Sequence, residues 1–333
     1  MSTRQGITIF GETSGDELAP ITTELLGIGK ELAGQMGQEL TALFVGDGVS
    51  AAAAQAFKYG ADRVIAIDAP LFADYMTDSY VGAVAKYDEQ YQPEAMLFGH
   101  TPAGRDLAPR LSFRLKTGLT LDCVALRFNE SSGLIEKVKP VYGGNAVATY
   151  VCEAARPQMA AVRPKTMTAA VKDESGTGEV VRFDPQIAES DVRGKFLGRE
   201  IEEFSGIKLE DAEVVVCGGR GLGGPEPFDQ LEELAKLLGG AVGASRPPCD
   251  SKWCPTSCQI GLTGKLISPS LYIGVALSGS SQHQAGMSGS KTIVAINKDE
   301  EANIFDFAHY GVVGEYQKVL PAFFAKCKEM MSK

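Results

Sequence analysis

The chain has 333 residues, and its 32 lysines and arginines against 42 aspartates and glutamates give a formal net charge of -10. Hydrophobic residues make up 44% and charged residues 22%, a globular composition that excludes wholesale disorder. The acidic balance argues against a nucleic-acid-binding protein, and no apolar window is long enough to insert across a membrane. The 38 glycines are unusually numerous, so their positions should matter.

The first hundred residues alternate between short apolar runs and segments with helical spacing. Short apolar runs are typical of buried parallel strands, and the alternation predicts βαβ crossovers with helices on both faces of a parallel sheet. We expect strands at 7–10, 41–45, 63–67 and 95–98, and helices at 17–36, 51–58 and 73–87.

From Gly118 to about Arg182 the pattern changes to strand-like runs joined by turn residues. This predicts antiparallel additions to the first sheet, at 121–128, 134–140, 146–153 and 159–163. The polar, glycine-bearing stretch that follows, 172–195, is our candidate linker.

After Ser205 the alternation begins again, with strands at 212–217, 271–276 and 292–296. Helices are expected at 227–238 and at 315–331, the latter interrupted near Pro321. The sequence therefore predicts an α/β protein of two domains. Residues 1–195 would form a Rossmann-like parallel sheet with antiparallel additions, and residues 206–333 a C-terminal α/β domain.

The second domain opens with a glycine motif, in which Gly219, Gly221 and Gly224 have the spacing G-x-G-x-x-G between a predicted strand and a predicted helix. Glycines in this context let the backbone approach a pyrophosphate, although a plain tight turn has the same pattern. The next strand ends at Ser245-Arg246. An arginine there suits the 2′-phosphate of NADPH better than the ribose of NADH, so an NADPH-dependent oxidoreductase is one interpretation.

Three further polar clusters lie at 259–265, 278–287 and 297–299, two of them directly after predicted strands. Ligands of open α/β sheets bind outside the carboxyl ends of the strands, so we expect the clusters to converge on one crevice. His283 would lie one helical turn in and face the ligand; the alternative is a core histidine whose hydrogen bonds are satisfied within the protein.

Several motifs carry a resemblance to a known family. They comprise Gly218-Gly219-Arg220-Gly221, Ala244-Ser245-Arg246, Gly261-x-Thr263-Gly264-Lys265, Ser278-Gly279 with Gln282-His283 and Ala285-Gly286-Met287, and the run 290–299. In this order they resemble the electron transfer flavoprotein alpha subunit. The resemblance extends over nearly the whole chain, and it is most specific from 213 to 316.

The resemblance implies a heterodimer with a beta subunit and an FAD held mainly by the C-terminal domain. Such proteins carry electrons from dehydrogenases, such as the acyl-CoA dehydrogenases of fatty acid beta-oxidation, to an acceptor such as a quinone oxidoreductase, and they transform no substrate themselves. An alternative within the family is a bifurcating version, in which NADH reduces a second FAD in the beta subunit and the electrons divide between ferredoxin and another acceptor.

Carried over position by position, the resemblance also implies roles at the cofactor. Arg220 would contact the phosphate or adenosine end, Arg246 would lie near N5, and Thr263 would donate a hydrogen bond to N5. His283 would face O2, and there it would supply positive charge together with Arg246. The implied cofactor-binding residues are Arg220, Ser245, Arg246, Ile260, Gly261, Leu262, Thr263, Ser278, Gly279, Ser280, Ser281, Gln282, His283, Asn297, Glu315 and Tyr316.

The chain departs from the family at Leu262, where a glutamine is usual, at Glu315, where an aspartate is usual, and at His309, where an aspartate is common. Cys249, Cys254 and Cys258 belong to no family pattern. Their spacing fits no standard zinc site, so they are either structural thiols or thiols with a metal-binding or redox role.

The seven cysteines are odd in number, and Cys123, Cys152 and Cys217 fall within predicted strands, as buried thiols do. The residues before the first predicted strand have no signal-peptide pattern. We therefore expect a reduced, cytoplasmic protein.

Overall fold

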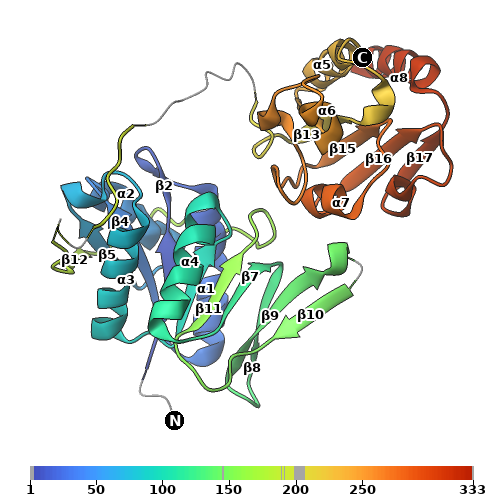
Figure 1. The fold of residues 1–333 in the computed structure, drawn as a ribbon. Coiled ribbons are helices and arrows are strands. Elements are labelled where there is room, and N and C mark those ends of the chain that lie inside the picture. Colours follow the sequence, from blue (N-terminus) through green and yellow to red (C-terminus); the bar gives the residue numbers. More distant parts are fainter. Residues whose placement is uncertain (1–3, 145, 189, 191, 199–206, 332–333) are drawn as a thin grey trace. The chain divides into compact units, whose positions relative to one another are not determined.

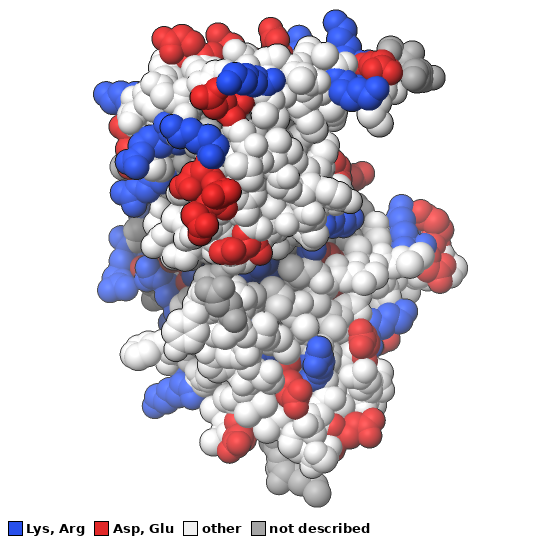
Figure 2. Space-filling model, turned by 90° about the vertical axis from the view of Figure 1, so that its right-hand side faces the viewer, with Lys and Arg blue, Asp and Glu red and all other residues white. Residues whose placement is uncertain are grey.

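The computed structural model of the chain describes residues 4–144, 146–188, 190, 192–198 and 207–331 (Figure 1). The chain divides into two compact units, one formed by Met1–Val141 with Val147–Arg199 and the other by Tyr142–Ala146 with Glu200–Lys333. Among the described residues, no helix is both long and apolar enough to cross a membrane. Figure 2 shows acidic and basic side chains intermixed over the face turned to the viewer.

The first unit is built on a seven-stranded sheet with the order β12-β5-β4-β1-β6-β11-β7, and every neighbouring pair in it is parallel. The predicted parallel α/β sheet is therefore confirmed. Its strands are β1 (Ile7–Gly11), β4 (Leu40–Gly46), β5 (Arg63–Asp68), β6 (Ala95–Gly99), β7 (Leu119–Cys123), β11 (Gln158–Val162) and β12 (Val180–Arg182).

Helices cover both faces of this sheet, because alternate side chains of each strand point to opposite sides. Ile7 and Ile9 of β1 share a core with Leu25 of α1, whereas Phe10 packs in a second core with Tyr80 of α3 and Leu107 of α4. The helices are α1 (Pro20–Met36), α2 (Ser50–Ala53), α3 (Thr77–Tyr91) and α4 (Pro102–Leu115), with 3-10 turns η1 (Ala54–Tyr59) and η2 (Pro70–Phe72).

Three predicted helices differ from the expectation, and the one expected at 73–87 is α3, which begins at Thr77 and ends at Tyr91. The helix expected at 17–36 begins at Pro20 rather than at residue 17, because β3 (Glu17–Leu18) pairs with β2 (Thr13–Ser14) just before it. The predicted helix at 51–58 is a single α-helical turn followed by a 3-10 helix.

The run expected at 159–163 as an antiparallel addition is instead β11, which pairs in parallel with β6 and β7 in the first sheet. The other antiparallel strands expected after Gly118 form a sheet of their own instead of extending the first sheet. This sheet contains β8 (Ala125–Asn129), β9 (Leu134–Val141) and β10 (Ala146–Tyr150), in the spatial order β10-β9-β8. The 3-10 turn η3 (Tyr142–Gly144) connects β9 to β10. The predicted strand 121–128 divides into β7 and β8, and Asp122 has a positive φ of 64° next to the division.

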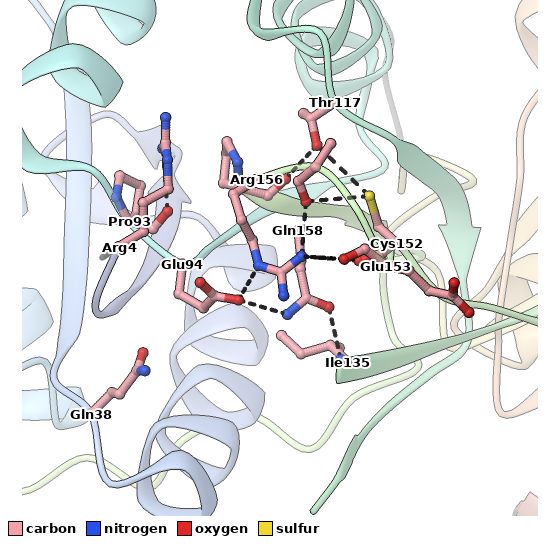
Figure 3. Close-up of polar contacts among 12 residues, drawn as sticks. Arg4, Gln38, Pro93, Glu94, Thr117, Ile135, Cys152, Glu153, Arg156 and Gln158 are labelled. Carbon is pink, nitrogen blue, oxygen red and sulfur yellow. Dashed lines mark hydrogen bonds and ion pairs between the residues drawn. The ribbon is translucent and has the colours of Figure 1, made fainter. Parts of the chain in front are cut away.

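A buried polar cluster joins this second sheet to the first (Figure 3). Gln158, at the start of β11, accepts a hydrogen bond from the backbone of Ile135 in β9 at 2.9 Å and donates one to Glu94 at 3.1 Å. Arg156 also pairs with Glu94. Since Gln158 and Ile135 are fully buried, these contacts satisfy polar groups that water cannot reach.

The candidate linker 172–195 is largely attached to the first unit. Its strand β12 pairs with β5, the backbone of Asp173 donates to Lys58 at 2.7 Å, and Glu174 forms ion pairs with Lys58 and Lys172. Phe183 and Ile187, which follow β12, also pack against the second core of the first unit.

The second unit has a five-stranded parallel sheet with the order β14-β13-β15-β16-β17. Its strands are β13 (Val214–Gly218), β14 (Ala241–Ala244), β15 (Leu271–Val275), β16 (Thr292–Asn297) and β17 (Tyr310–Val313), the last of which was not predicted as a strand. Chain order is reversed between β13 and β15, since β14 lies on one side of β13 and all later strands lie on the other. In open α/β sheets this reversal creates a crevice at the carboxyl ends of the two strands.

Helices also cover both faces of this second sheet. Leu231 of α5 and Leu320 of α8 pack with Ile273, whereas Met287 of α7 packs with Tyr272 on the other face. The helices are α5 (Pro227–Leu237), α6 (Arg246–Asp250), α7 (Ser281–Met287) and α8 (Tyr316–Met331), with 3-10 turns η5 (Arg220–Leu222), η6 (Thr256–Cys258) and η7 (Asn303–Asp306). The terminal helix continues through Pro321 without the expected interruption.

Candidate functional site

A cleft of about 620 Å³ lies at the carboxyl ends of β13, β14, β15 and β16. Its volume falls within the range of about 300–1,000 Å³ that is usual for small-molecule and cofactor sites. All the predicted cofactor-binding residues except Ser281, Glu315 and Tyr316 line it. The expected convergence of the four polar clusters on one crevice is therefore what the structure shows.

The glycine motif after β13 packs against the loop after β15. The backbone of Gly219 donates to Val275 at 2.9 Å, and that of Gly221 donates to Ala276 at 3.0 Å. A Cβ at position 219 would lie 2.3 Å from the carbonyl oxygen of Ala276, closer than any real side chain allows. Glycine is thus required at position 219 by the close approach of two backbones.

The loop from Ser278 to Ser280 leads from β15 into α7 and presents two hydroxyl groups to the cleft. Gly279 has a φ of 75°, and a Cβ there would lie 2.5 Å from the backbone nitrogen of Ile304. The buried side chain of Gln284 fixes the loop by donating to the carbonyl of Gly279 at 2.6 Å. These contacts, together with the hydrogen bond from the backbone of Ile304 to Ser278 at 3.0 Å, join the loop to α7 and η7.

The loop 259–265 forms another wall of the cleft. Gln259 donates from Nε2 to the hydroxyl oxygen of Thr263 at 3.0 Å, which leaves the hydroxyl hydrogen of Thr263 able to donate elsewhere. Leu262 is 59% exposed and lines the cleft with an apolar side chain.

His283 lines the cleft, but both of its ring nitrogens have partners within the protein. Nδ1 lies 3.0 Å from the carbonyl oxygen of Ile260, and Nε2 lies 2.7 Å from the hydroxyl of Tyr272. Burial lowers the pKa of His283 to about 4, so the ring is neutral at pH 7. The structure thus gives His283 the hydrogen bonds of a core histidine. The expectation that it carries a positive charge is wrong, because the ring is neutral.

The cleft is lined by three positively charged residues, Arg220, Arg246 and Lys298, and by two negatively charged ones, Asp250 and Asp299. Arg246, the first residue of α6, lies 3.2 Å from Asp250 one turn later, and both side chains are exposed. The cleft therefore carries a small excess of positive charge, which suits a ligand with phosphate groups.

Asn297 braces the cleft through both ends of its side-chain amide. It donates to the carbonyl of Leu277 at 2.8 Å and accepts from the backbone of Asp299 at 3.0 Å. It also lines a smaller cavity of about 110 Å³, to which Glu315 and Tyr316 contribute. Asn297 is thus the predicted residue that lines both cavities.

Ser281 is the one predicted residue that lines neither of these two cavities; its hydroxyl lies 3.4 Å from Gln282. Asp250 lines the cleft and was not predicted. It could have been found from its i+4 spacing to Arg246.

Cys249, Cys254 and Cys258 lie around α6 and the turn that follows it. Cys249 and Cys254 have their sulfur atoms 3.5 Å apart. Among the described residues, no group of three or more His, Cys, Asp or Glu side chains is arranged to hold a metal ion.

Comparison with known proteins connects this geometry to a family. Residues 7–188 match the family model of the electron transfer flavoprotein domain, and residues 208–288 match that of the electron transfer flavoprotein FAD-binding domain. The second match contains the glycine motif, the loop 259–265 and the residues 278–287, so the segment that forms most of the cleft is the FAD-binding one.

Individual proteins that are similar to this chain point to the same family as the family models. The electron transfer flavoprotein subunit alpha of Thermoanaerobacterium thermosaccharolyticum is 43% identical over 99% of this chain and 100% of its own length. That of Clostridium acetobutylicum is 39% identical over 97% of each chain. Subunit LctC of the lactate dehydrogenase (NAD(+),ferredoxin) of Acetobacterium woodii is 36% identical over 95% of this chain and 75% of its own. The chain therefore belongs to the family of electron transfer flavoprotein alpha subunits.

Proposed function

We propose that this chain holds FAD in the cleft of its second unit and, paired with a beta subunit, carries electrons from a dehydrogenase to a separate acceptor. The observation that supports this most is the convergence of the predicted cofactor residues on one cleft at the strand reversal between β13 and β15. When bound, FAD supplies one- and two-electron redox chemistry that amino-acid side chains lack.

The residues of the cleft fit this cofactor. Gly219 and Gly279 stand where a Cβ would meet neighbouring backbone, which keeps the loops close enough for a diphosphate to contact backbone amides. Hydroxyl groups from Ser278 and Ser280 and the guanidinium of Arg220 would add donors for the phosphate groups. Apolar and polar groups thus occur together, as a flat ring joined to a charged diphosphate requires.

We assign the ring end of the cofactor to the residues around α6 and the loop 259–265. Ser245 and Arg246 would lie beside the ring system, and the hydroxyl of Thr263, oriented by Gln259, would donate a hydrogen bond to it. Ile260, Gly261 and Leu262 would cover its apolar surface. Asn297, Glu315 and Tyr316 would hold the adenosine end.

Arg246 is then the side chain that supplies positive charge near the ring, because His283 is neutral. A cation beside a group that gains electrons stabilises its reduced state and raises its potential. Asp250, which pairs with Arg246, would moderate this effect. We infer that the Arg246–Asp250 pair sets part of the potential.

The donors and acceptors belong to the same proposal. We propose acyl-CoA dehydrogenases as donors and a quinone-linked oxidoreductase as acceptor, in the cytoplasm. Family membership supports the heterodimer. The seven free thiols support a reducing compartment.

Co-expression with the partner subunit tests the proposal. We expect a yellow heterodimer with one FAD and one AMP, which is reduced by a dehydrogenase with its substrate. Colourless protein, or FAD retained only by the partner subunit after the two are separated, would refute it.

A second candidate function is favoured by one observation, the similarity to a subunit of a lactate dehydrogenase whose name includes NAD(+) and ferredoxin. In that case the heterodimer would take part in bifurcation, with a second FAD in the beta subunit. The two candidates differ in flavin count. Two FAD per heterodimer and bleaching by NADH alone would favour bifurcation, and one FAD with AMP would favour the ordinary carrier.

A further inference from the structure

The five-residue helix α6 ends in a turn that brings two cysteines together. The backbone of Trp253 donates to Pro248 at 3.0 Å, and that of Lys252 donates to Cys249 at 2.9 Å. Lys252 has a φ of 59°, in the left-handed region. These are the two hydrogen bonds and the left-handed residue of a Schellman motif, which reverses the chain after a helix.

The reversal places Cys254 beside Cys249, with 3.5 Å between their sulfur atoms. A disulfide bond has an S–S distance of about 2.0 Å, so a small rotation of the two side chains brings the sulfurs within bonding distance. Cys249 is 7% exposed, whereas Cys254 is half-buried and the more accessible of the two.

We propose that Cys249 and Cys254 are a redox-active dithiol, which low-molecular-weight disulfides convert into an intramolecular disulfide. In the first step, the thiolate of Cys254 attacks one sulfur of the external disulfide and releases one thiolate. The thiolate of Cys249 then attacks the sulfur of Cys254, forms the new bond and releases the second thiolate. The pair loses two electrons, the external disulfide gains two, and the two cysteine protons go to the released thiols.

The surroundings of the pair favour the closing step. The loop between the cysteines is short and already folded, so closing it restricts the chain little further. Cys258 is present in the next turn, η6, and provides a matched thiol outside the pair.

Cys249 lies in α6 together with Arg246 and Asp250, two residues of the cofactor cleft. The disulfide would therefore bond the helix that lines the cleft covalently to the turn that follows it. This proposal does not depend on which donor or acceptor the protein uses, because it requires only the thiols and an external disulfide.

The test uses the full-length chain co-purified with its partner subunit. The reduced protein is equilibrated with increasing ratios of oxidised to reduced glutathione, quenched with acid, alkylated under denaturing conditions and mapped by mass spectrometry. We expect Cys249 and Cys254 to become protected from alkylation together, in one cross-linked peptide, while Cys258 remains alkylated.

Variants complete the test. Cys258→Ser should form the same disulfide at the same glutathione ratio, whereas Cys249→Ser should form none within the chain and should accumulate glutathione on Cys254 instead. The proposal is overturned if the wild-type pair stays alkylated at every ratio, or if Cys258→Ser abolishes the cross-link. Because the wild-type protein alone can give the first negative result, the test does not depend on how the variants fold.

Discussion

The phenol of Tyr272 donates its hydrogen to Nε2 of His283 across 2.7 Å. This direction follows from the other ring nitrogen: Nδ1 faces the carbonyl oxygen of Ile260, which can only accept, so in the neutral ring Nδ1 carries the hydrogen and Nε2 accepts. Tyr272 is fully buried, and His283 is 4% exposed. The pair fixes both the tautomer and the orientation of the imidazole at the wall of the cleft.

Tyr272→Phe tests this relationship. Removal of the hydroxyl leaves Nε2 buried, with only the sulfur of Cys217 nearby at 3.9 Å, and an unsatisfied buried acceptor costs about 1–3 kcal/mol. We expect the free energy of unfolding in urea to fall by that amount. Tyr310→Phe is the control, since Tyr310 is 67% exposed and should change stability little. Equal effects of the two variants would contradict the assignment.

The neutral state of His283 also predicts a pH dependence. Its pKa is lowered to about 4 in the folded protein against about 6.5 when unfolded, so the unfolded chain binds the proton first. Stability is then complete above pH 6.5 and falls as the pH decreases towards 4, by about 3 kcal/mol. The neighbouring groups Tyr272 and Cys217 stay neutral in this range because burial raises the pKa of both.

His283→Gln isolates this contribution, because burial also lowers the pKa of His100 to about 4, and that residue contributes its own slope. The unfolding free energy of wild type and variant should be compared in urea at pH 7 and at pH 4.5. We expect a smaller loss in the variant. If both proteins lose the same stability, His283 is not the titrating group.

The sequence predicted the cleft well, because its residues follow strand ends that hydrophobic runs and glycines mark. It left His283 open between a ligand-facing residue and a core histidine, because the partner hydroxyl of Tyr272 comes from the interior of β15 and the carbonyl of Ile260 comes from a separate loop. Such contacts depend on how the elements pack, and local pattern contains no sign of them.

The same limit explains two misplaced features of the first unit. β12 lies in a polar segment without a strand pattern. It is a strand because it pairs with β5, and this pairing cannot be predicted from the segment itself. The separate antiparallel sheet could not be distinguished from an extension of the first, because turn residues indicate a hairpin but not the sheet that the hairpin joins.

Arg246→Ala and Asp250→Asn should change the cofactor in opposite directions. Loss of the cation should lower the flavin midpoint potential, and loss of the neighbouring carboxylate should raise it, each by the equivalent of about 1 kcal/mol for an exposed pair. Spectroelectrochemical titration of the heterodimer measures both shifts. Lys236→Ala, on the exposed side of α5, is the charge-matched control. A potential unchanged by Arg246→Ala would refute the role of this residue.

Gln158→Leu should destabilise the first unit. The change removes the acceptor for the backbone of Ile135 and a donor to Glu94, in a site with no exposure to water. We expect a loss of about 1–3 kcal/mol in the unfolding free energy. Gln35→Leu, on the exposed side of α1, should stay within about 0.5 kcal/mol of wild type. Urea denaturation followed by circular dichroism distinguishes the two.

Lys252→Gly should stabilise the second unit, although most glycine substitutions destabilise. Lys252 is exposed and has a φ of 59°, a conformation in which its Cβ crowds the following carbonyl. Glycine removes that strain while keeping the backbone hydrogen bonds that end α6, and we expect a gain of about 0.5–1 kcal/mol after the entropic cost of glycine. Lys236→Gly, the same change in the last turn of α5, should instead cost up to about 1 kcal/mol. Thermal unfolding of the two variants should therefore shift in opposite directions. Parallel destabilisation would mean that the lysine side chain stabilises the turn more than the backbone strain disfavours it.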